Sequence, residues 1–147
     1  MGVATMGVQR TLMRAANALP VKLYRMSNGR LVGTAAGLAT LLLTVAGRKT
    51  GVEHTTLVAY FEDDGRYVVT GSAGGSATEP QWFRNLRHAD RAVVQIGPTR
   101  IEVGVAIADA AEHAVLWERL VARAFGFARY QAKVERQIPI ATLTPRN

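Results

Sequence analysis

Two cations lie side by side on a short turn between two predicted strands. Gly47-Arg48-Lys49-Thr50-Gly51 carries a guanidinium and an ammonium group between glycines. Such a turn offers phosphate charge-assisted hydrogen bonds together with free backbone N–H groups. A P-loop is excluded, because Leu42 stands where its first glycine belongs and a strand follows instead of a helix. The pattern favours an anion site, with an ordinary solvated hairpin as the alternative.

A loop of small residues forms a second candidate site. Ser72-Ala73-Gly74-Gly75-Ser76 leads into a predicted helix that ends near Arg87, with Thr78 as its N-cap and Gln81 at the capping-box position. Glycine loops and helix N-termini present N–H donors to anions or to flat ring edges. The spacing of the glycines does not match a Rossmann fingerprint. A flexible connection is the alternative interpretation.

Aromatic and amide side chains follow this loop. Trp82 and Asn85 share one face of the predicted helix, so Trp82 could stack on a cofactor ring and Asn85 could hydrogen-bond the ring or its tail. Nearer the C-terminus, where aromatic residues including Phe127 gather, Tyr130 could line a substrate pocket and donate a proton. The alternatives are packed aromatic side chains and a capping or surface asparagine.

Composition narrows the chemistry further. The chain has 147 residues, 48% of them apolar, which fits a domain with its own core. It has no cysteine, and His54, His88 and His113 lie far apart without carboxylates at ligand spacing, so no metal site is predicted.

The positive charge is concentrated in the first third of the chain. The net charge is +7, and no acidic residue precedes Glu53. This distribution indicates an anionic partner: a cofactor phosphate, an anionic membrane surface or nucleic acid. Nucleic acid is disfavoured, because the aromatic residues do not interleave with the basic ones.

The N-terminal segment, residues 1–30, is predicted to be a basic amphipathic helix. Its apolar residues recur every three or four positions, Arg10 and Arg14 fall on another face, and Pro20 should bend or interrupt it. The helix either packs on the rest of the protein or touches anionic lipid. The uncharged stretch at residues 31–47 is diluted by Gly and Thr and is not expected to span a membrane. We expect a cytoplasmic protein, with peripheral contact at the inner face of the cell membrane as an option.

Residues 31–147 are predicted to form one cofactor-binding domain of the α+β class. Most strands are joined as hairpins, and Asp64-Gly65 is a strong signal for a type I′ turn. Helices and strands do not alternate regularly, so we predict a split β-barrel of about six mostly antiparallel strands with three or four peripheral helices. The predicted strands are residues 40–46, 55–61, 66–70, 92–96, 101–107 and 138–143, and the predicted helices are residues 78–87, 128–135 and a segment from the Asp109 cap to about 124.

Four motifs in this order resemble a known family. They are Gly47-Arg48-Lys49-Thr50-Gly51, Ser72-Ala73-Gly74-Gly75, Pro80-Gln81-Trp82-Phe83-Arg84-Asn85-Leu86, and Tyr130-Gln131 with Arg136-Gln137-Ile138-Pro139. Together they resemble the deazaflavin (coenzyme F420)-dependent nitroreductases of actinobacteria. The similarity extends from about Tyr24 to Pro145.

The resemblance implies a barrel like that of FMN-binding oxidoreductases and a cofactor with a deazaflavin ring, a phosphate and an oligoglutamate tail. It implies hydride transfer from reduced coenzyme F420 to an electron-poor acceptor such as a quinone or nitroaromatic. FMN is the alternative cofactor, and a non-catalytic carrier of lipid or another apolar ligand is the alternative function. Both a monomer and a homodimer fit.

By position, the resemblance also assigns residues. Cofactor-binding residues would be Arg48, Lys49, Thr50, His54, Ser72, Ala73, Gly74, Gly75, Trp82 and Asn85; Phe127 and Tyr130 would contact the substrate, and Tyr130 would be catalytic. His54 replaces a usual arginine and Ala73 a common lysine or asparagine. Tail binding could therefore use Arg84, Arg87 or Arg66 instead. Phe127 stands where the nitroreductases can carry another tyrosine.

Overall fold

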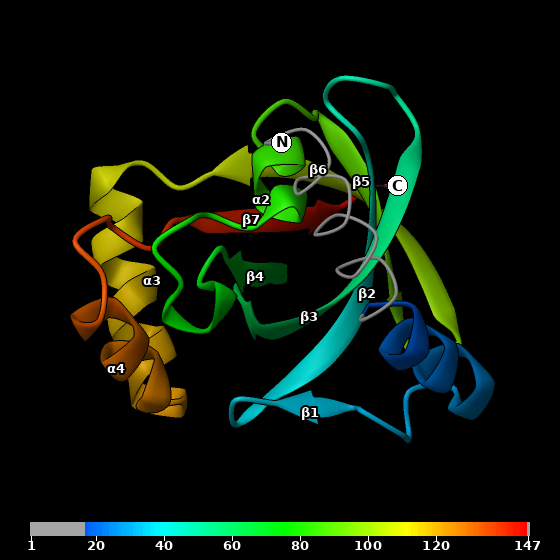
Figure 1. The fold of residues 1–147 in the computed structure, drawn as a ribbon, viewed down its shortest axis with the longest axis horizontal. Coiled ribbons are helices and arrows are strands. Elements are labelled where there is room, and N and C mark those ends of the chain that lie inside the picture. Colours follow the sequence, from blue (N-terminus) through cyan, green and yellow to red (C-terminus); the bar gives the residue numbers. More distant parts are fainter. Residues whose placement is uncertain (1–16, 147) are drawn as a thin grey trace, which may run out of the picture.

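The computed structural model describes residues 17–146, which fold into a closed antiparallel barrel with helices around it (Figure 1). The helix at residues 17–27 comes first. The strands are β1 (Thr34–Ala35), β2 (Leu38–Ala46), β3 (Glu53–Asp63), β4 (Arg66–Thr70), β5 (Arg91–Ile96), β6 (Thr99–Ile107) and β7 (Ile140–Pro145). The later helices are the short turn η1 (Ala73–Gly75), α2 (Gln81–Leu86), α3 (Ala110–Arg123) and α4 (Gly126–Ala132).

All strand pairings in the described part of the chain are antiparallel, and β2 closes the barrel. The sheet order is β1-β2-β3-β4-β7-β6-β5, and β2 also pairs with β5 through Leu43 and Val94. Six strands therefore form the closed barrel, while β1 is a short extension beside β2. The predicted fold class is confirmed; β1, with only two exposed residues, gave no pattern to predict.

The apolar run in β2 is explained by burial of both of its faces. Leu41, Leu43 and Val45 belong to the barrel core, whereas Leu42 packs against Val21 and Tyr24 of the N-terminal helix. A strand buried on both faces appears as a continuous apolar run instead of an alternating one. No helix within residues 17–146 is both long enough and apolar enough to cross a membrane.

The turns follow the predicted local chemistry, with one exception. Asp64 and Gly65 both have positive φ, as the type I′ hairpin between β3 and β4 requires. The Asp109 carboxylate accepts a hydrogen bond from the Glu112 amide at 2.9 Å and caps α3 as predicted. The predicted cap at Thr78 is wrong, because α2 starts only after Pro80, and a proline disfavours helical geometry in the residue before it.

The helix at residues 17–27 packs on the barrel on the side opposite α3 and α4 (Figure 1). It is continuous through Pro20, so of the bend or interruption predicted there the interruption does not occur. The carbonyl that a non-proline residue at this position would bond belongs to residue 16, outside the described range. The predicted helix residues before Asn17, Arg10 and Arg14 among them, also lie outside the described range. The helix ends at Asn28 and Gly29, both with positive φ, where the Gly29 amide donates to the Tyr24 carbonyl.

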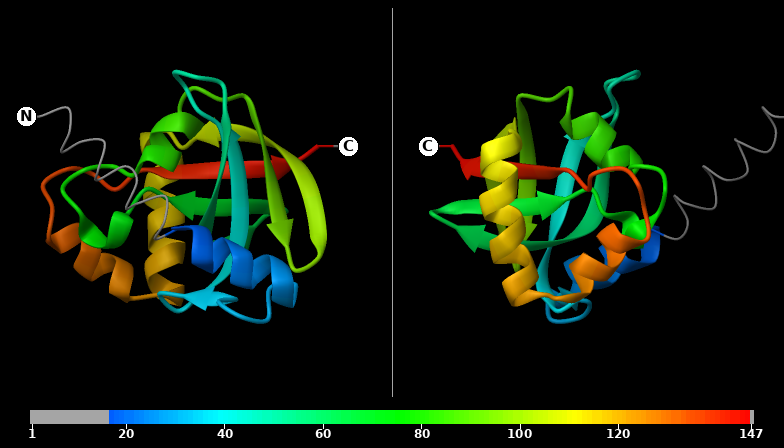
Figure 2. Two further views of the ribbon diagram at one scale, coloured as in Figure 1. Left: turned by 45° about the vertical axis from the view of Figure 1, so that its right-hand side comes forward. Right: turned by 90° about the vertical axis from the view of Figure 1, so that its left-hand side faces the viewer.

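The helices α3 and α4 lie at different places around the barrel. Figure 2 shows α3 standing along the outside of the barrel and α4 continuing from one end of it. Leu116 and Leu120 of α3 share a buried cluster with Phe127 of α4 and Val68 of β4. This cluster fixes α4 beside η1, where one of the candidate site loops lies.

Replacing Tyr24 by phenylalanine is expected to lower the free energy of unfolding by about 1–3 kcal/mol. The Tyr24 hydroxyl is buried, accepts from the Gly97 amide at 2.8 Å and donates to the Thr40 carbonyl at 3.3 Å. The substitution leaves both backbone groups without this partner. Urea unfolding measures the change; the control Tyr67→Phe, whose hydroxyl bonds no described atom, should stay within about 0.5 kcal/mol. Equal losses in the two variants would contradict the assignment.

Candidate functional site

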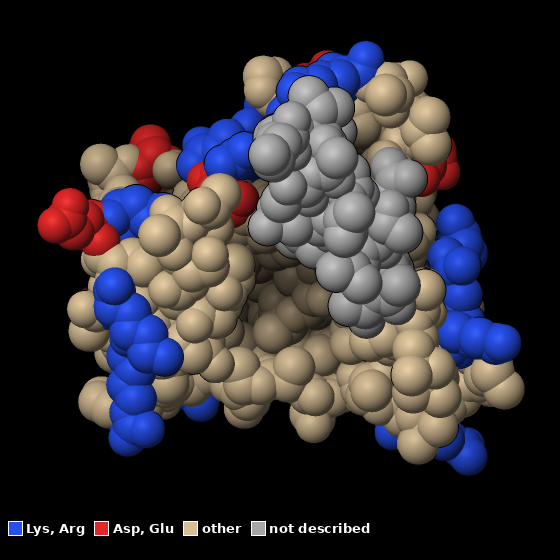
Figure 3. Space-filling model, viewed as in Figure 1, with Lys and Arg blue, Asp and Glu red and all other residues tan. Residues whose placement is uncertain are grey.

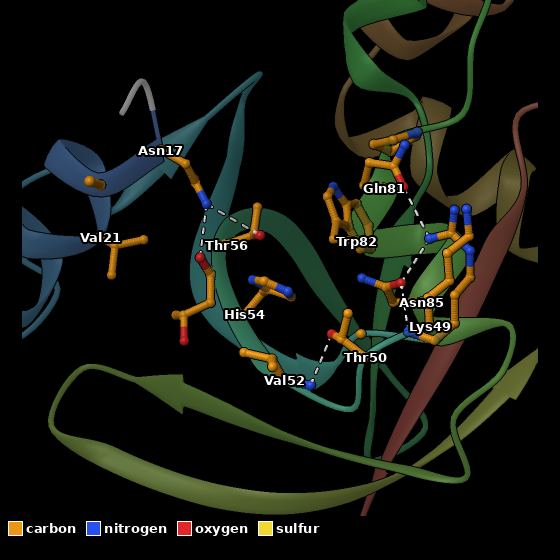
Figure 4. Close-up of a pocket in the computed structure, with 15 residues that line it drawn as sticks. Asn17, Val21, Lys49, Thr50, Val52, His54, Thr56, Gln81, Trp82 and Asn85 are labelled. Carbon is orange, nitrogen blue, oxygen red and sulfur yellow. Dashed lines mark hydrogen bonds between the residues drawn. The ribbon is translucent and has the colours of Figure 1, made fainter. Parts of the chain in front are cut away.

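A cavity of about 940 Å³ lies between the N-terminal helix, β3 and α2. Figure 4 shows Asn17 and Val21 on one side of it and Gln81, Trp82 and Asn85 on the other. This volume is at the upper end of the range usual for cofactor and ligand pockets, roughly 300–1,000 Å³. The face of the molecule drawn in Figure 3 is hollowed near its centre, and Lys and Arg side chains gather at the top of the molecule in this view.

The cationic turn forms one end of this cavity. Arg48, Lys49 and Thr50 all line it, and His54 lies on the adjoining strand β3. The turn is closed by two backbone hydrogen bonds of 2.8 Å, from the Gly47 amide to the Val52 carbonyl and from the Gly51 amide to the Gly47 carbonyl. Within residues 17–146, the amides of Lys49 and Thr50 find no protein acceptor. The cation pair and free amides that the sequence indicated therefore meet at a cavity wall.

Asn85 holds Arg48 in place. The Asn85 side-chain oxygen accepts from the Arg48 backbone amide at 3.1 Å and from its guanidinium at 2.8 Å. The same guanidinium nitrogen donates to the Gln81 side-chain oxygen at 3.0 Å. Asn85 is only 7% exposed, so its side chain is fixed in the wall. Its amide oxygen is thus committed to the turn, a role that helical spacing alone did not reveal.

A second, smaller cavity of about 180 Å³ adjoins the small-residue loop. Ser72, Ala73 and Gly74 line it on one side, and Leu57 and Phe127 line it elsewhere. Trp82 lines both cavities. A flat ring beside Trp82 would therefore have the amide-bearing loop near one edge, while a tail from the same molecule could reach the cationic turn.

The loop adopts an unusual backbone conformation. Ala73, Gly74 and Gly75 have φ of +46°, +63° and +85°, the left-handed region. The Gly75 amide donates to the Ser72 carbonyl, and the Ser76 amide donates to the Ala73 carbonyl. Of the amides predicted to meet the ring, the one of Gly75 is therefore already occupied within the loop.

Replacing Ala73 by glycine is expected to raise the free energy of unfolding by about 1 kcal/mol, because glycine adopts positive φ without the steric cost that alanine pays. Thermal unfolding measures the gain, and Ala77→Gly, an exposed position outside the positive-φ run, is the control. A loss of stability in Ala73→Gly, or the same change in both variants, would be inconsistent with strain at Ala73.

Tyr130 lies against the loop at Gly75. A Cβ atom added to Gly75 would come within 3.2 Å of the Tyr130 backbone, and neither residue lines either cavity. Phe127 does line the smaller cavity, and the Tyr130 ring packs edge-on against it at 5.3 Å between centroids. The catalytic role of Tyr130 stays a prediction, and the geometry supports Phe127 more directly as a substrate contact.

The arginines considered as substitutes for tail binding do not line the large cavity. Arg66 pairs with Glu112 and Asp63, and Arg87 pairs with Glu79 at 2.8 Å. The hydrogen bond from Arg87 lowers the pKa of Glu79, which stabilises the charged form of this carboxylate. Among residues 17–146, Arg48 and Lys49 are consequently the Lys and Arg side chains that line this cavity.

Several wall residues carried no signal in the sequence. Asn17 donates its side-chain amide to the Thr55 carbonyl at 2.8 Å and to the Thr56 hydroxyl at 3.3 Å, which draws the N-terminal helix to β3 at the cavity. Gln81 was considered only as a helix cap, yet it bonds Arg48. Contacts of this kind join segments far apart in the sequence, so only the folded arrangement shows them.

The closed antiparallel barrel with peripheral helices is a split-barrel fold. A solved structure described as an F420-H2 dependent reductase aligns with a TM-score of 0.64 and 26% identity, over 71% of this chain and 92% of that one. Another solved chain, described as a domain-swapped dimer, shares the fold with a TM-score of 0.67 and 23% identity, over 95% of this chain and 98% of its own.

Proteins similar in sequence identify the family, which the structural similarities alone do not. The family model described as F420H(2)-dependent quinone reductase matches residues 17–145. Two Mycobacterium tuberculosis proteins named as F420H(2)-dependent quinone reductases are similar to the chain. One is 38% identical over 73% of this chain and 90% of its own length, and the other is 33% identical over 95% and 93%. The chain belongs to the F420H(2)-dependent quinone reductase family, so it is an oxidoreductase whose cofactor is coenzyme F420.

Proposed function

We propose that the Arg48-Lys49 turn binds the phosphate and glutamate tail of coenzyme F420, while the deazaflavin ring lies beside Trp82 with its edge toward Ser72 and Ala73. The observation that carries this proposal is the position of Trp82, which lines both cavities. One molecule with a flat ring and an anionic tail would occupy the two cavities together. The larger cavity supplies the volume and the two cations that such a tail needs.

Reduced coenzyme F420, when bound, supplies a hydride; reduction of a quinone to its hydroquinone consumes that hydride and one proton. The protein's own contribution is to fix the ring and leave room for the acceptor, since close approach of the reacting atoms supplies much of the rate. Leu57 and Phe127 give the smaller cavity apolar walls, which suit a flat ring, and the acceptor would approach the open face of that ring. Solvent water or the Tyr130 hydroxyl would deliver the proton.

Binding and turnover test this proposal. Titration of the protein into coenzyme F420 should quench its fluorescence with saturation in the range of about 10 µM or tighter. Oxidation of reduced F420 by menadione should then depend on enzyme concentration. Absence of saturable F420 binding, or tighter binding of FMN than of F420, would refute the proposed use of this cavity.

We also propose that the exposed side of the N-terminal helix contacts anionic membranes. Met26 is 73% and Leu19 60% exposed, and Lys22, Arg25 and Arg30 are exposed beside them. Apolar side chains next to cations are typical of interfacial helices. Wild type should cosediment with anionic liposomes in low salt, whereas the variant K22Q/R30Q should bind at least threefold less. Equal sedimentation of the two proteins, or equal binding to neutral liposomes, would contradict this contact.

The assembly in solution has two candidates, a monomer and a homodimer. The homodimer is supported by the neighbour described as a domain-swapped dimer, whose likeness to this chain concerns the fold alone. Light scattering coupled to gel filtration distinguishes the two by mass.

A further inference from the structure

The Arg136 side chain donates hydrogen bonds to three carbonyl groups in and beside the small-residue loop. One guanidinium nitrogen, Nη2, donates to the carbonyls of Gly71, Ser72 and Ser76 at 3.1, 3.2 and 2.9 Å. The Nε atom donates to the Ser76 carbonyl at 3.0 Å. A single side chain therefore holds both ends of the loop that lines the smaller cavity, from a position 60 to 65 residues further along the chain.

These bonds determine where the loop's amides point. In a planar trans peptide the N–H group points opposite to the C=O group. The carbonyls of Gly71 and Ser72 face Arg136, so the amides of Ser72 and Ala73, which share those peptide planes, face away from it. Both residues line the smaller cavity, and neither amide finds a protein acceptor within the part of the chain that the structure describes.

The segment that carries Arg136 is itself held from two sides. The Gln131 side chain donates to the Arg136 carbonyl at 2.8 Å and accepts from the Ile138 amide at 2.8 Å. His113 Nε2 contacts the Ile138 carbonyl at 2.7 Å. The Gly71 amide donates to the Pro139 carbonyl, and the Pro139 and Phe83 rings pack so close to Gly71 that a Cβ atom there would lie within 3.0 Å of both. The guanidinium is thus presented to the loop from a rigid support.

Stabilisation of the folded protein alone does not account for all features of the Arg136 contacts. The Nη1 atom of Arg136 is buried and has no hydrogen-bond partner among the described atoms. An unmatched buried donor opposes the stability that the other bonds provide. The loop also retains positive φ at Ala73, a conformation that a non-glycine residue adopts only at a steric cost.

We propose that Arg136 is a positioning residue: it turns the amides of Ser72 and Ala73 into the smaller cavity, where they donate hydrogen bonds to the electron-rich edge of the bound deazaflavin ring. This inference rests on the proposed cofactor site. Two functions are then separated in space. Arg136 orients the amides that bind the ring, and the Arg48-Lys49 turn binds the tail.

The two ends of the cofactor can be tested separately. The probes are coenzyme F420 and the same deazaflavin ring without phosphate and glutamates. Arg136→Gln and Arg136→Lys should weaken binding of both probes by the same factor, about tenfold for the loss of one to two amide bonds. Arg129→Gln, which removes an equal charge from α4, should change neither affinity by more than about twofold.

A readout without cofactor accompanies the titrations. In free protein, hydrogen–deuterium exchange of residues 71–76 should be faster in both Arg136 variants than in wild type and Arg129→Gln, while exchange of β2 and β3 is unchanged. Arg136→Lys retains the charge, so it also serves if the glutamine variant folds poorly. Unchanged affinity for the tail-free ring, or weakening of the full coenzyme alone, would overturn the positioning role. Failure of wild type to bind F420 would instead refute the proposed cofactor site.

Discussion

Replacing Arg48 and Lys49 together by glutamine is expected to weaken binding of coenzyme F420 by about 10²- to 10⁴-fold. Each charge-assisted bond to an anion is worth roughly 1.5–3 kcal/mol, and two such bonds are lost. Both side chains line the larger cavity at one end, and Arg48 is already oriented by Asn85 and Gln81. Fluorescence titration at fixed ionic strength measures the change.

The matched control removes two charges elsewhere. Arg30 and Arg100 are exposed, and neither lines a cavity, so R30Q/R100Q should bind F420 within about threefold of wild type. Similar losses in the two double variants would mean that F420 responds only to the overall charge of the protein. A loss smaller than tenfold in R48Q/K49Q would show that the tail is bound elsewhere.

Replacing Asn85 by leucine is expected to lower the free energy of unfolding by about 1–3 kcal/mol and F420 affinity about tenfold or more. The buried side-chain oxygen that accepts from the Arg48 amide and guanidinium is lost, so a polar group is left without its partner and the arginine loses its orientation. Urea unfolding and F420 titration on the same protein measure the two effects.

Two companion variants separate stability from charge. Asn85→Asp retains the acceptor oxygens and should fold with near wild-type stability, yet its carboxylate offsets the charge of Arg48 and weakens F420 binding. Gln81→Leu removes only the exposed bond to Arg48 and should change affinity by less than about threefold. If Asn85→Leu binds F420 as wild type does, Asn85 does not organise the turn.

Local signals predicted most of the fold. The strands from β2 to β7 were found within a few residues, because β-branched and apolar runs between turn residues are local features. The Asp64-Gly65 hairpin and the Asp109 cap also depend on neighbours within the same few residues. The predicted start of α2 at Thr78 is wrong because Pro80 disfavours helical geometry in the residue before it.

Long-range contacts in the site could not be predicted in the same way. The turn, the small-residue loop and Trp82 were identified by residue type, and all three reach a cavity wall. The bonds that orient them join Arg48 to Asn85 and Arg136 to Gly71, pairs separated by 37 and 65 positions. Their geometry depends on barrel closure through β2 and β5, and no periodicity in the sequence encodes it.

In this proposal the two cavities have separate roles: the larger binds the tail of the cofactor and the smaller receives its ring. Charge and free amides lie at the turn, apolar walls and loop amides lie at the smaller cavity, and Trp82 joins them. Substitutions at one end should therefore leave binding at the other nearly unchanged, as independent sites require.

The most direct test compares how strongly the protein prefers the full coenzyme over its tail-free ring. Wild type should bind coenzyme F420 at least a hundredfold more tightly than the ring alone, since two cations engage the tail. In R48Q/K49Q this preference should fall to within about fivefold, with affinity for the ring itself unchanged. A preference that survives the double substitution would contradict the claim that this turn anchors the cofactor.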